Sequence, residues 1–221
     1  MSTFNKTPYL ALLLIFPILG YIYGNLNENR SDATILITKL DSIIPFLPIF
    51  ILPYILWYLF ILAYLIYFWS KDTKIYIRTL SIIVLGELVS FVIYYFFQTT
   101  IPRPALGDKG FLINLVQIIY SHDQPYNCFP SIHVLTTFSI ILGSFHIKNK
   151  LIFHTFFIQV SGFLIIISTL FVKQHGILDI LGSIFLTLFM YGIVFSISHA
   201  QKKSKQIYLR EGMETHKFQQ K

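Results

Sequence analysis

Residues 46–69 have the sequence FLPIFILPYILWYLFILAYLIYFW, and none of these residues is charged. A run of this length is long enough to cross the hydrocarbon core of a bilayer, which takes about 20 residues of helix. The whole chain shares this character, because 55% of its 221 residues are hydrophobic and only 12% are charged. Soluble chains usually contain about 25% charged residues. The sequence therefore predicts an integral membrane protein and excludes a soluble enzyme.

Six apolar runs, separated by polar connections, predict six membrane-spanning helices. The runs cover residues 9–23, 46–69, 80–97, 132–147, 151–172 and 177–198. The first and fourth runs are short, and Pro45 and Pro48 predict that the chain bends as it enters the second. We expect an all-α fold with a single transmembrane domain over residues 1–198 and a basic tail over residues 199–221.

The distribution of lysine and arginine predicts the orientation of the chain, because positively charged connections are retained in the cytoplasm. One side of the predicted bundle, with both chain ends, holds 12 of these residues, and the other side holds 5. Six of the 17 basic residues follow Ser198, so the net charge of +7 indicates a cytoplasmic tail rather than nucleic-acid binding. We predict a cell-membrane protein with cytoplasmic termini, whose connections after the first, third and fifth spans face outward.

The first polar group on the predicted outer side is Arg103-Pro104, just after the third span. A guanidinium group presents a planar fork that binds two phosphate oxygens at once. The alternative is an interfacial arginine that reaches from a helix end into the head-group layer.

The second group is Pro130-Ser131-Ile132-His133, directly before the fourth span. Ser131 suits the N-cap of a helix, where free backbone amides can face an anion. His133 would then lie in the first turn, where an imidazolium can donate a proton to a leaving oxygen. The alternative is an ordinary capped helix with an interfacial histidine.

The third group contains Ser168, Lys173, His175 and Asp179, around the connection between the fifth and sixth spans. A helical i,i+4 spacing would bring the Asp179 carboxylate to the His175 ring. A carboxylate behind a histidine fixes its tautomer and leaves the other nitrogen to act as a nucleophile. The alternative is a polar pair that joins two helices, although ionisable groups at membrane depth are usually functional.

Together, the three groups resemble the motifs of the type 2 phosphatidic acid phosphatase superfamily: Lys-x6-Arg-Pro, Pro-Ser-x-His and Ser-Arg-x5-His-x3-Asp. The similarity covers the third to sixth spans, but Phe96 replaces the motif lysine and Thr169 replaces the motif arginine. Lys173 is our candidate to replace that arginine if the fifth helix extends so far, and Gln98 is a candidate neutral donor near the missing lysine. The combination of Cys-x-Pro-Ser-x-His with Ser-Thr-x5-His-x3-Asp is most similar to the branch containing inositol phosphoceramide synthases.

The resemblance implies an all-α six-helix membrane bundle of the phosphatidic acid phosphatase type 2 / vanadium haloperoxidase-like kind, and a lipid phosphatase that uses neither metal nor cofactor. It implies that His175 attacks phosphorus, Asp179 orients His175 and His133 protonates the leaving oxygen. The expected phosphate-binding residues are Arg103, Ser131, Lys173 and Ser168. The partners would be a lipid phosphate or pyrophosphate and the bilayer, with no nucleic acid and no specified oligomeric state. One alternative is a phosphotransferase that passes the head group to an alcohol, and another is a non-enzymatic transporter or lipid-binding scaffold.

Three further features lie outside these motifs. Glu87, near the middle of the third span, needs either a partner on another helix or a place in the wall of a head-group cavity. Residues 111–120 are mostly apolar with two polar positions, which predicts an interfacial helix over the site. Cys128 is the only cysteine, so an intramolecular disulfide is excluded and cysteine chemistry is not expected.

Overall fold

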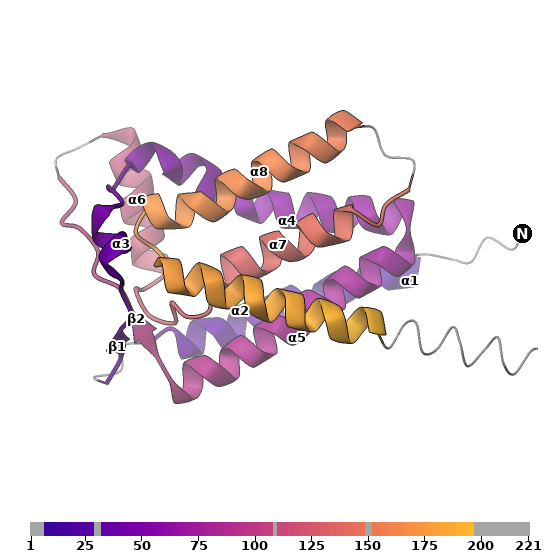
Figure 1. The fold of residues 1–221 in the computed structure, drawn as a ribbon, viewed down its shortest axis with the longest axis horizontal. Helices are drawn as coiled ribbons and strands as arrows, with labels where there is room; N and C mark the ends of the chain where they lie inside the picture. The colour runs from indigo at the N-terminus through magenta and orange to yellow at the C-terminus, as the bar shows by residue number, and fades with distance from the viewer. Residues whose placement is uncertain (1–6, 29–31, 108–109, 149–151, 197–221) are drawn as a thin grey trace, which may run out of the picture.

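The computed structural model describes residues 7–28, 32–107, 110–148 and 152–196, and Figure 1 shows a bundle of long helices. Its elements are α1 (Thr7–Leu10), η1 (Ala11–Leu14), α2 (Ile15–Leu26), β1 (Thr34–Ile35), α3 (Lys39–Ile43), η2 (Pro48–Phe50), α4 (Ile51–Lys71), α5 (Thr73–Phe96), β2 (Thr99–Thr100), α6 (Phe111–His122), α7 (Ile132–Ser144), α8 (Ile152–Phe171) and an unlabelled last helix, Ile177–Ser196. The predicted all-α membrane fold is confirmed. The predicted tail, residues 199–221, lies outside the described residues.

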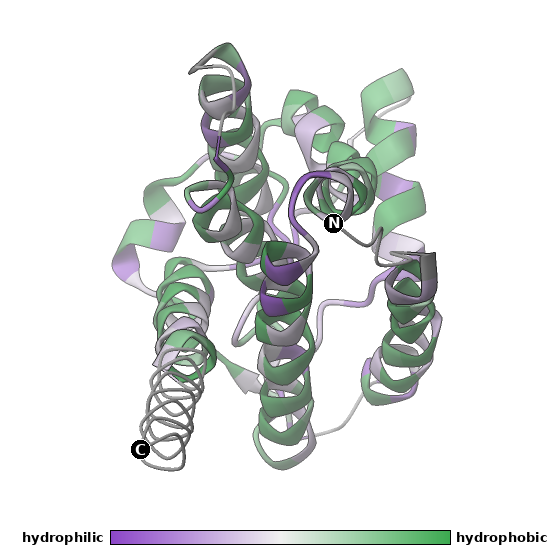
Figure 2. Ribbon diagram, turned by 90° about the vertical axis from the view of Figure 1, so that its right-hand side faces the viewer, coloured by the Kyte–Doolittle hydropathy of each residue, from purple (hydrophilic) through white to green (hydrophobic). Residues whose placement is uncertain are grey.

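Five of the described helical segments are long and apolar enough to cross a membrane. They are Pro8–Leu26, Pro48–Lys71, Thr73–Phe96, Phe153–Phe171 and Ile177–Ser196. Each corresponds to one of the predicted spans. Large apolar side chains point outward along these helices, and Phe153 and Phe185 are 75% and 73% exposed. Figure 2 shows that hydrophobic residues predominate along the long helices, as a multi-pass membrane protein requires.

The fourth predicted span corresponds to α7, which is shorter than the other membrane helices. It has 13 residues, or roughly 20 Å of helix at 1.5 Å per residue. It packs against α4, α5 and α8, so protein surrounds it instead of lipid. Its buried hydroxyl groups bond to its own backbone, as when Thr137 donates to the His133 carbonyl over 2.6 Å. This internal pairing lets a helix rich in Ser and Thr lie inside the bundle.

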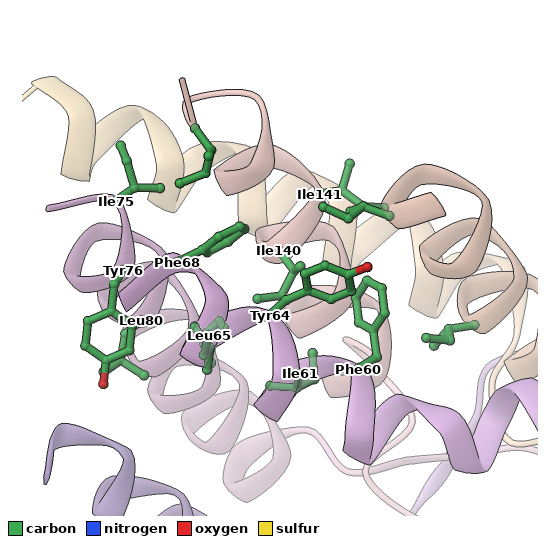
Figure 3. Close-up of a cluster of buried hydrophobic side chains, with 14 residues drawn as sticks. Phe60, Ile61, Tyr64, Leu65, Phe68, Ile75, Tyr76, Leu80, Ile140 and Ile141 are labelled. Carbon is green, nitrogen blue, oxygen red and sulfur yellow. The ribbon is translucent and has the colours of Figure 1, made fainter. Parts of the chain in front are cut away.

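The main core lies between α4, α5, α7 and α8, and Figure 3 shows part of it. Tyr64 and Phe68 of α4 meet Tyr76 of α5 and Ile140 of α7 in this cluster. Gly143, near the end of α7, lies where a Cβ atom would be 2.3 Å from the Thr79 hydroxyl. The absence of a side chain at Gly143 thus allows the end of α7 to approach α5 and α4 closely.

The short elements β1, β2, α3 and α6 gather at one end of the bundle, on the left in Figure 1. β1 and β2 form a parallel pair in which Thr34 lies opposite Thr99. The Thr99 hydroxyl accepts a hydrogen bond from the Phe129 amide over 2.8 Å. This small sheet was not predicted, and it joins the connection between the first two predicted spans to the two segments that carry Arg103 and the Pro130–His133 motif. The predicted bend before α4 is present as α3 followed by η2.

Candidate active site

All three predicted motif segments meet at the end of the bundle that carries the small sheet. The first follows β2, the second starts α7, and the third joins α8 to the last helix. A backbone hydrogen bond joins the second and third segments, in which the Asp179 carbonyl accepts from the Ser131 amide over 3.4 Å. The Ser183 hydroxyl lies 2.6 Å from the Asp179 carbonyl oxygen and 2.9 Å from that of Ser131, so its single proton bridges the two segments. The relative position of the two motifs is therefore set by main-chain contacts.

His175 and Asp179 form the centre of the site. The Nδ1 atom of His175 lies 3.0 Å from the Cys128 carbonyl oxygen and 3.6 Å from Oδ2 of Asp179. Two acceptors at Nδ1 favour the tautomer that carries its proton there, which leaves a lone pair on Nε2. Asp179 is fully buried, and its Oδ2 also accepts the Gly176 amide over 2.7 Å. The last helix begins only at Ile177, so the contact comes from the preceding turn and not from a helical face.

His133 faces the other nitrogen of His175. Its Nδ1 lies 3.4 Å from Nε2 of His175, and both residues are 7% exposed. The His133 ring packs against the rings of Trp57 and Tyr54, with centroids 4.3 and 4.7 Å away. Its Nε2 atom has no hydrogen-bond partner within the described part of the chain. The two rings therefore face each other directly, through Nδ1 of His133 and Nε2 of His175.

Arg103 lies beside the histidines and is held by neutral groups. Its Nη1 donates to the Tyr120 carbonyl over 3.1 Å, and its Nη2 donates to the Asp123 carbonyl over 2.6 Å and to the Gln174 side chain. The guanidinium also stacks over the Tyr120 ring at 4.0 Å. Burial lowers the pKa of Arg103, and the charge of Asp123 opposes this shift. Because the ordinary pKa of arginine is far above neutral pH, Arg103 remains a cation. Because its bonds go to neutral oxygens, its positive charge is available to an anion.

Lys173 reaches the site through a strained turn, since α8 ends at Phe171 instead of extending to it. Its φ is 53°, in the left-handed region that residues other than glycine rarely adopt. Its ammonium group donates to the carbonyls of Asp41 and Ile44 over 3.0 and 2.6 Å. Burial lowers the pKa of Lys173, and the nearby Asp41 carboxylate opposes this. The observed strain at this position is of the kind that often occurs at functional sites.

The two predicted serines have different positions. Ser131 caps α7, and its hydroxyl accepts from the Val134 amide over 3.3 Å. Ser168 is buried within α8, donates to the Ile165 carbonyl over 2.6 Å and lines neither of the cavities described below. The structure therefore brings Ser131 to the site, and it places the Ser168 hydroxyl in the interior of the bundle.

Two cavities meet at His175. The first has a volume of about 400 Å³ and is lined by Arg103, Lys173 and His175 together with residues of the α3 segment. The second has a volume of about 710 Å³ and extends between α2, α4, α5 and α7, mostly along apolar side chains. His133 and Glu87 lie on the wall of the second cavity. A space lined by two cations and the Asp41 carboxylate thus joins a mostly apolar space at one histidine.

One group of side chains at the site has the composition of a metal site. The ligand atoms of Cys128, His175 and Asp179 lie within 4.8 Å of one another. Burial, and then the charge of Asp179, raise the pKa of the Cys128 thiol well above its usual range, so the thiol keeps its proton unless a bound cation displaces it. A metal bound through the free nitrogen of His175 would occupy the atom that faces His133.

Three residues at this end were not singled out from the sequence. Asp41 accepts the Ile177 amide at the start of the last helix over 2.8 Å, and Gln174 accepts from Arg103. Asp123 accepts from Tyr23 and Asn27 over 2.7 and 2.9 Å. Only Asp41 had a sequence signal, because Thr38-x-x-Asp41 has the spacing of a capping box and forms one.

One of the comparisons with known proteins identifies a family. A protein-family model, the PAP2 superfamily, matches residues 75–203, which is more than half of the chain. The protein therefore belongs to the PAP2 superfamily, an all-α family of membrane phosphoesterases and phosphotransferases. The comparisons with curated proteins and with solved structures gave no significant match.

Proposed function

We propose that this protein is a lipid phosphatase of the outer membrane face that works through a phosphohistidine on His175. The observation that carries the proposal is the arrangement of His175, with Nδ1 facing two oxygen acceptors and Nε2 facing His133, where a cationic cavity meets an apolar one. An enzyme that acts on a lipid at the interface needs both spaces. The fit to the motifs of the family supports the same roles.

The proposed reaction has two steps. In the first, Nε2 of His175 attacks phosphorus, the bond from phosphorus to the lipid oxygen breaks, and protonated His133 gives its proton to that oxygen. In the second, water attacks phosphorus, the phosphorus–nitrogen bond breaks, and His133 takes up the proton of the water. Asp179 stabilises the charge that develops on His175. No step in this scheme requires a metal, and chelation tests that feature directly.

The phosphate oxygens would be held chiefly by Arg103 and Lys173. The motif lysine has no substitute at its own position, because Phe96 is 80% exposed and points away from the bundle. The Thr169 hydroxyl bonds to the Ile166 carbonyl over 2.8 Å. The Gln98 amide donates to the carbonyls of Leu26 and Glu28 and to the side chain of Asn127, so its donors are already used. A site with two cations suits a phosphate monoester, which carries up to two negative charges.

The orientation we propose follows from the opposite end of the bundle. Lys71 ends α4, and Lys74 and Arg78 lie in the first turns of α5, all away from the candidate site. Positive residues mark the cytoplasmic side. The site then faces out of the cytoplasm and both termini face in.

A phosphotransferase is the second candidate. His175 lines two cavities, so once the dephosphorylated lipid has left, an alcohol can reach the position opposite the phosphorus–nitrogen bond, where His133 can take its proton. In that reaction the alcohol replaces water in the second step and the products are a new phosphate ester and free enzyme.

The test is phosphate release by detergent-purified protein from a panel of lipid phosphates, with EDTA present. The His175→Ala variant should lose all activity, and His154→Ala, at the other end of the bundle, should keep it. Labelled phosphate should be trapped on wild-type protein as an acid-labile, alkali-stable adduct. Activity that survives in His175→Ala overturns the proposal, and activity lost to EDTA replaces it with a metal-dependent reaction. Release only when an alcohol is added favours the transferase, and transport without turnover favours a carrier.

A further inference from the structure

Glu87 is a buried carboxyl group inside the larger cavity. It lies in the middle of α5, it is 5% exposed, and its side chain lines the cavity of about 710 Å³ that ends at His133 and His175. Among residues 7–28, 32–107, 110–148 and 152–196, none gives this carboxyl group a hydrogen bond or an ion pair. A buried polar group without a partner is costly, so its presence beside the site calls for a ligand.

The other carboxyl group on the wall of this cavity shows the contrast. Asp123 accepts hydrogen bonds from the side chains of Tyr23, Asn27 and Tyr54. Its role is structural, because these bonds join α2 and α4 to the end of α6. Glu87 lies in the same cavity with its acceptor oxygens unused, so it is equipped to bind what enters the cavity.

The depth of Glu87 relative to the histidines indicates which part of a lipid it would meet. Its neighbour Gly86 packs against Leu135 of α7, where a Cβ atom would lie 2.8 Å from the Leu135 side chain. Tyr94, two helical turns further along α5, bonds to the Pro130 carbonyl beside the site. Glu87 therefore lies roughly 5–10 Å inward of the phosphate position, from the rise of 1.5 Å per residue in both helices. At this depth a phosphorylated lipid presents the substituents of the backbone carbons next to its phosphate.

We propose that Glu87 selects lipid phosphates that carry a hydrogen-bond donor, a hydroxyl or an N–H group, on the backbone beside the phosphate. A carboxyl group accepts a hydrogen bond through its carbonyl oxygen in either protonation state. Lipids of the single-chain glycerol or sphingoid type carry such donors, whereas diacylglycerol phosphates and polyprenyl phosphates do not. In this class of substrate the donor satisfies Glu87, and donor-free lipids leave it unpaired. The inference rests on the proposed function for its catalytic consequence, but the binding preference itself does not.

The kinetic test compares wild type with Glu87→Leu and Glu87→Gln. Leucine keeps the volume but removes the acceptor, and glutamine keeps an acceptor oxygen. Three of the test lipids carry a donor. Lysophosphatidate offers a hydroxyl, and a sphingoid-base phosphate and its N-acyl form offer both N–H and hydroxyl groups. The two donor-free lipids are diacyl phosphatidate and a polyprenyl phosphate. We expect Glu87→Leu to lower kcat/KM by about 10- to 100-fold for the donor-bearing lipids, the range for one hydrogen bond to a carboxyl group. For the donor-free lipids, kcat/KM should stay the same or rise, because the variant no longer leaves a carboxyl group unpaired. Glu87→Gln should stay within several-fold of wild type for all of them.

Leu88→Ala is the matched control, since Leu88 is adjacent in α5 but 43% exposed on the outer surface. It should change no preference. The proposal is overturned if Glu87→Leu lowers activity equally for all lipids or leaves the preferences of wild type intact. Comparison of the hydroxyl-only lipid with the N–H lipids shows which donor Glu87 binds.

A binding arm separates this inference from the proposed function. Trp57 lines the same cavity, with its indole N–H bonded to the Thr136 hydroxyl over 2.8 Å. In a His175→Ala, Trp69→Phe background, quenching of Trp57 fluorescence reports lipid binding without turnover. Tighter binding of donor-bearing lipids supports the inference even if no lipid is hydrolysed, in which case only the proposed function fails. Equal Kd values for matched lipids with and without the donor overturn the inference, and this comparison needs no substitution at Glu87.

Discussion

The two ends of the bundle contain similar residues in different surroundings. At the end with the small sheet, His133 and His175 face each other in the interior, with Asp179 behind one of them. At the other end, His146 bonds to the Tyr191 hydroxyl over 2.7 Å, and the His154 ring packs at a tilt against the rings of Tyr64 and Tyr67. Both ends also contain cations. The comparison shows that a histidine becomes a candidate nucleophile through a buried carboxylate and an adjoining cavity, and not through its charge environment alone.

The carboxylates of the two ends differ in the same way. Asp179 faces a histidine ring, whereas Asp72 caps α5 by accepting from the amides of Lys74 and Ile75 over 2.9 and 3.3 Å. The first carboxylate lies next to an atom that can react, and the second stabilises a helix end. Substitution by asparagine should separate these roles cleanly.

The largest expected effect is that of Asp179→Asn. An asparagine can donate to Nδ1 of His175 and so favour the wrong tautomer, and it no longer stabilises a charged ring. We expect kcat to fall by about 10²- to 10⁴-fold, as for other histidines deprived of their carboxylate. Asp72→Asn should leave kcat unchanged and lower the free energy of unfolding by about 1 kcal/mol or less. Phosphate release and thermal unfolding in detergent measure the two quantities, and equal effects on kcat would remove the distinction between the ends.

A smaller effect is expected from Asp41→Asn, because Asp41 acts on the site through the turn that carries His175. Burial of Asp41 opposes its ionisation, but hydrogen bonds from Thr38 and from the Ile177 amide, with Lys173 nearby, outweigh burial and lower the pKa of the carboxyl group. The substitution weakens the cap of the last helix. We expect kcat to fall by about 10-fold through misplacement of His175, with KM little changed.

The lowered pKa of Asp41 also predicts a pH dependence. A carboxyl group whose pKa is lower in the folded state than in the unfolded chain stabilises the fold above the unfolded value, about 4, and loses this contribution as the pH falls through the folded value. The difference in unfolding temperature between wild type and Asp41→Asn should therefore be constant from pH 5 to 7 and shrink below about pH 4. A difference that grows on acidification would contradict this assignment.

Much of this molecule follows from its sequence, and the exceptions have physical causes. Apolar runs fix the long helices because helix length is set by the bilayer, and the spacing of the three motifs brings His133, His175 and Asp179 to one end. The roles of Asp41 and Asp123 depend on contacts across 136 and 100 residues, respectively. No local pattern encodes such contacts. Ser168 shows the opposite case, because it matches the motif but its hydroxyl bonds within its own helix.

The smallest expected effect comes from two glycines of the last helix, one near each end. A Cβ atom on Gly182 would lie 2.3 Å from the Phe129 ring, next to the Pro130–His133 motif, while Gly192 has nothing within 4 Å. Gly182→Ala must displace that ring and should cost about 1–3 kcal/mol of stability, the usual range for overpacking. Gly192→Ala should instead be neutral or stabilise the helix by up to about 1 kcal/mol, because alanine is the better helix former. Unfolding temperatures of the two variants in detergent measure this difference in stability. An equal loss of stability at both glycines would mean that the last helix packs no more tightly against its neighbours at the site than at the far end.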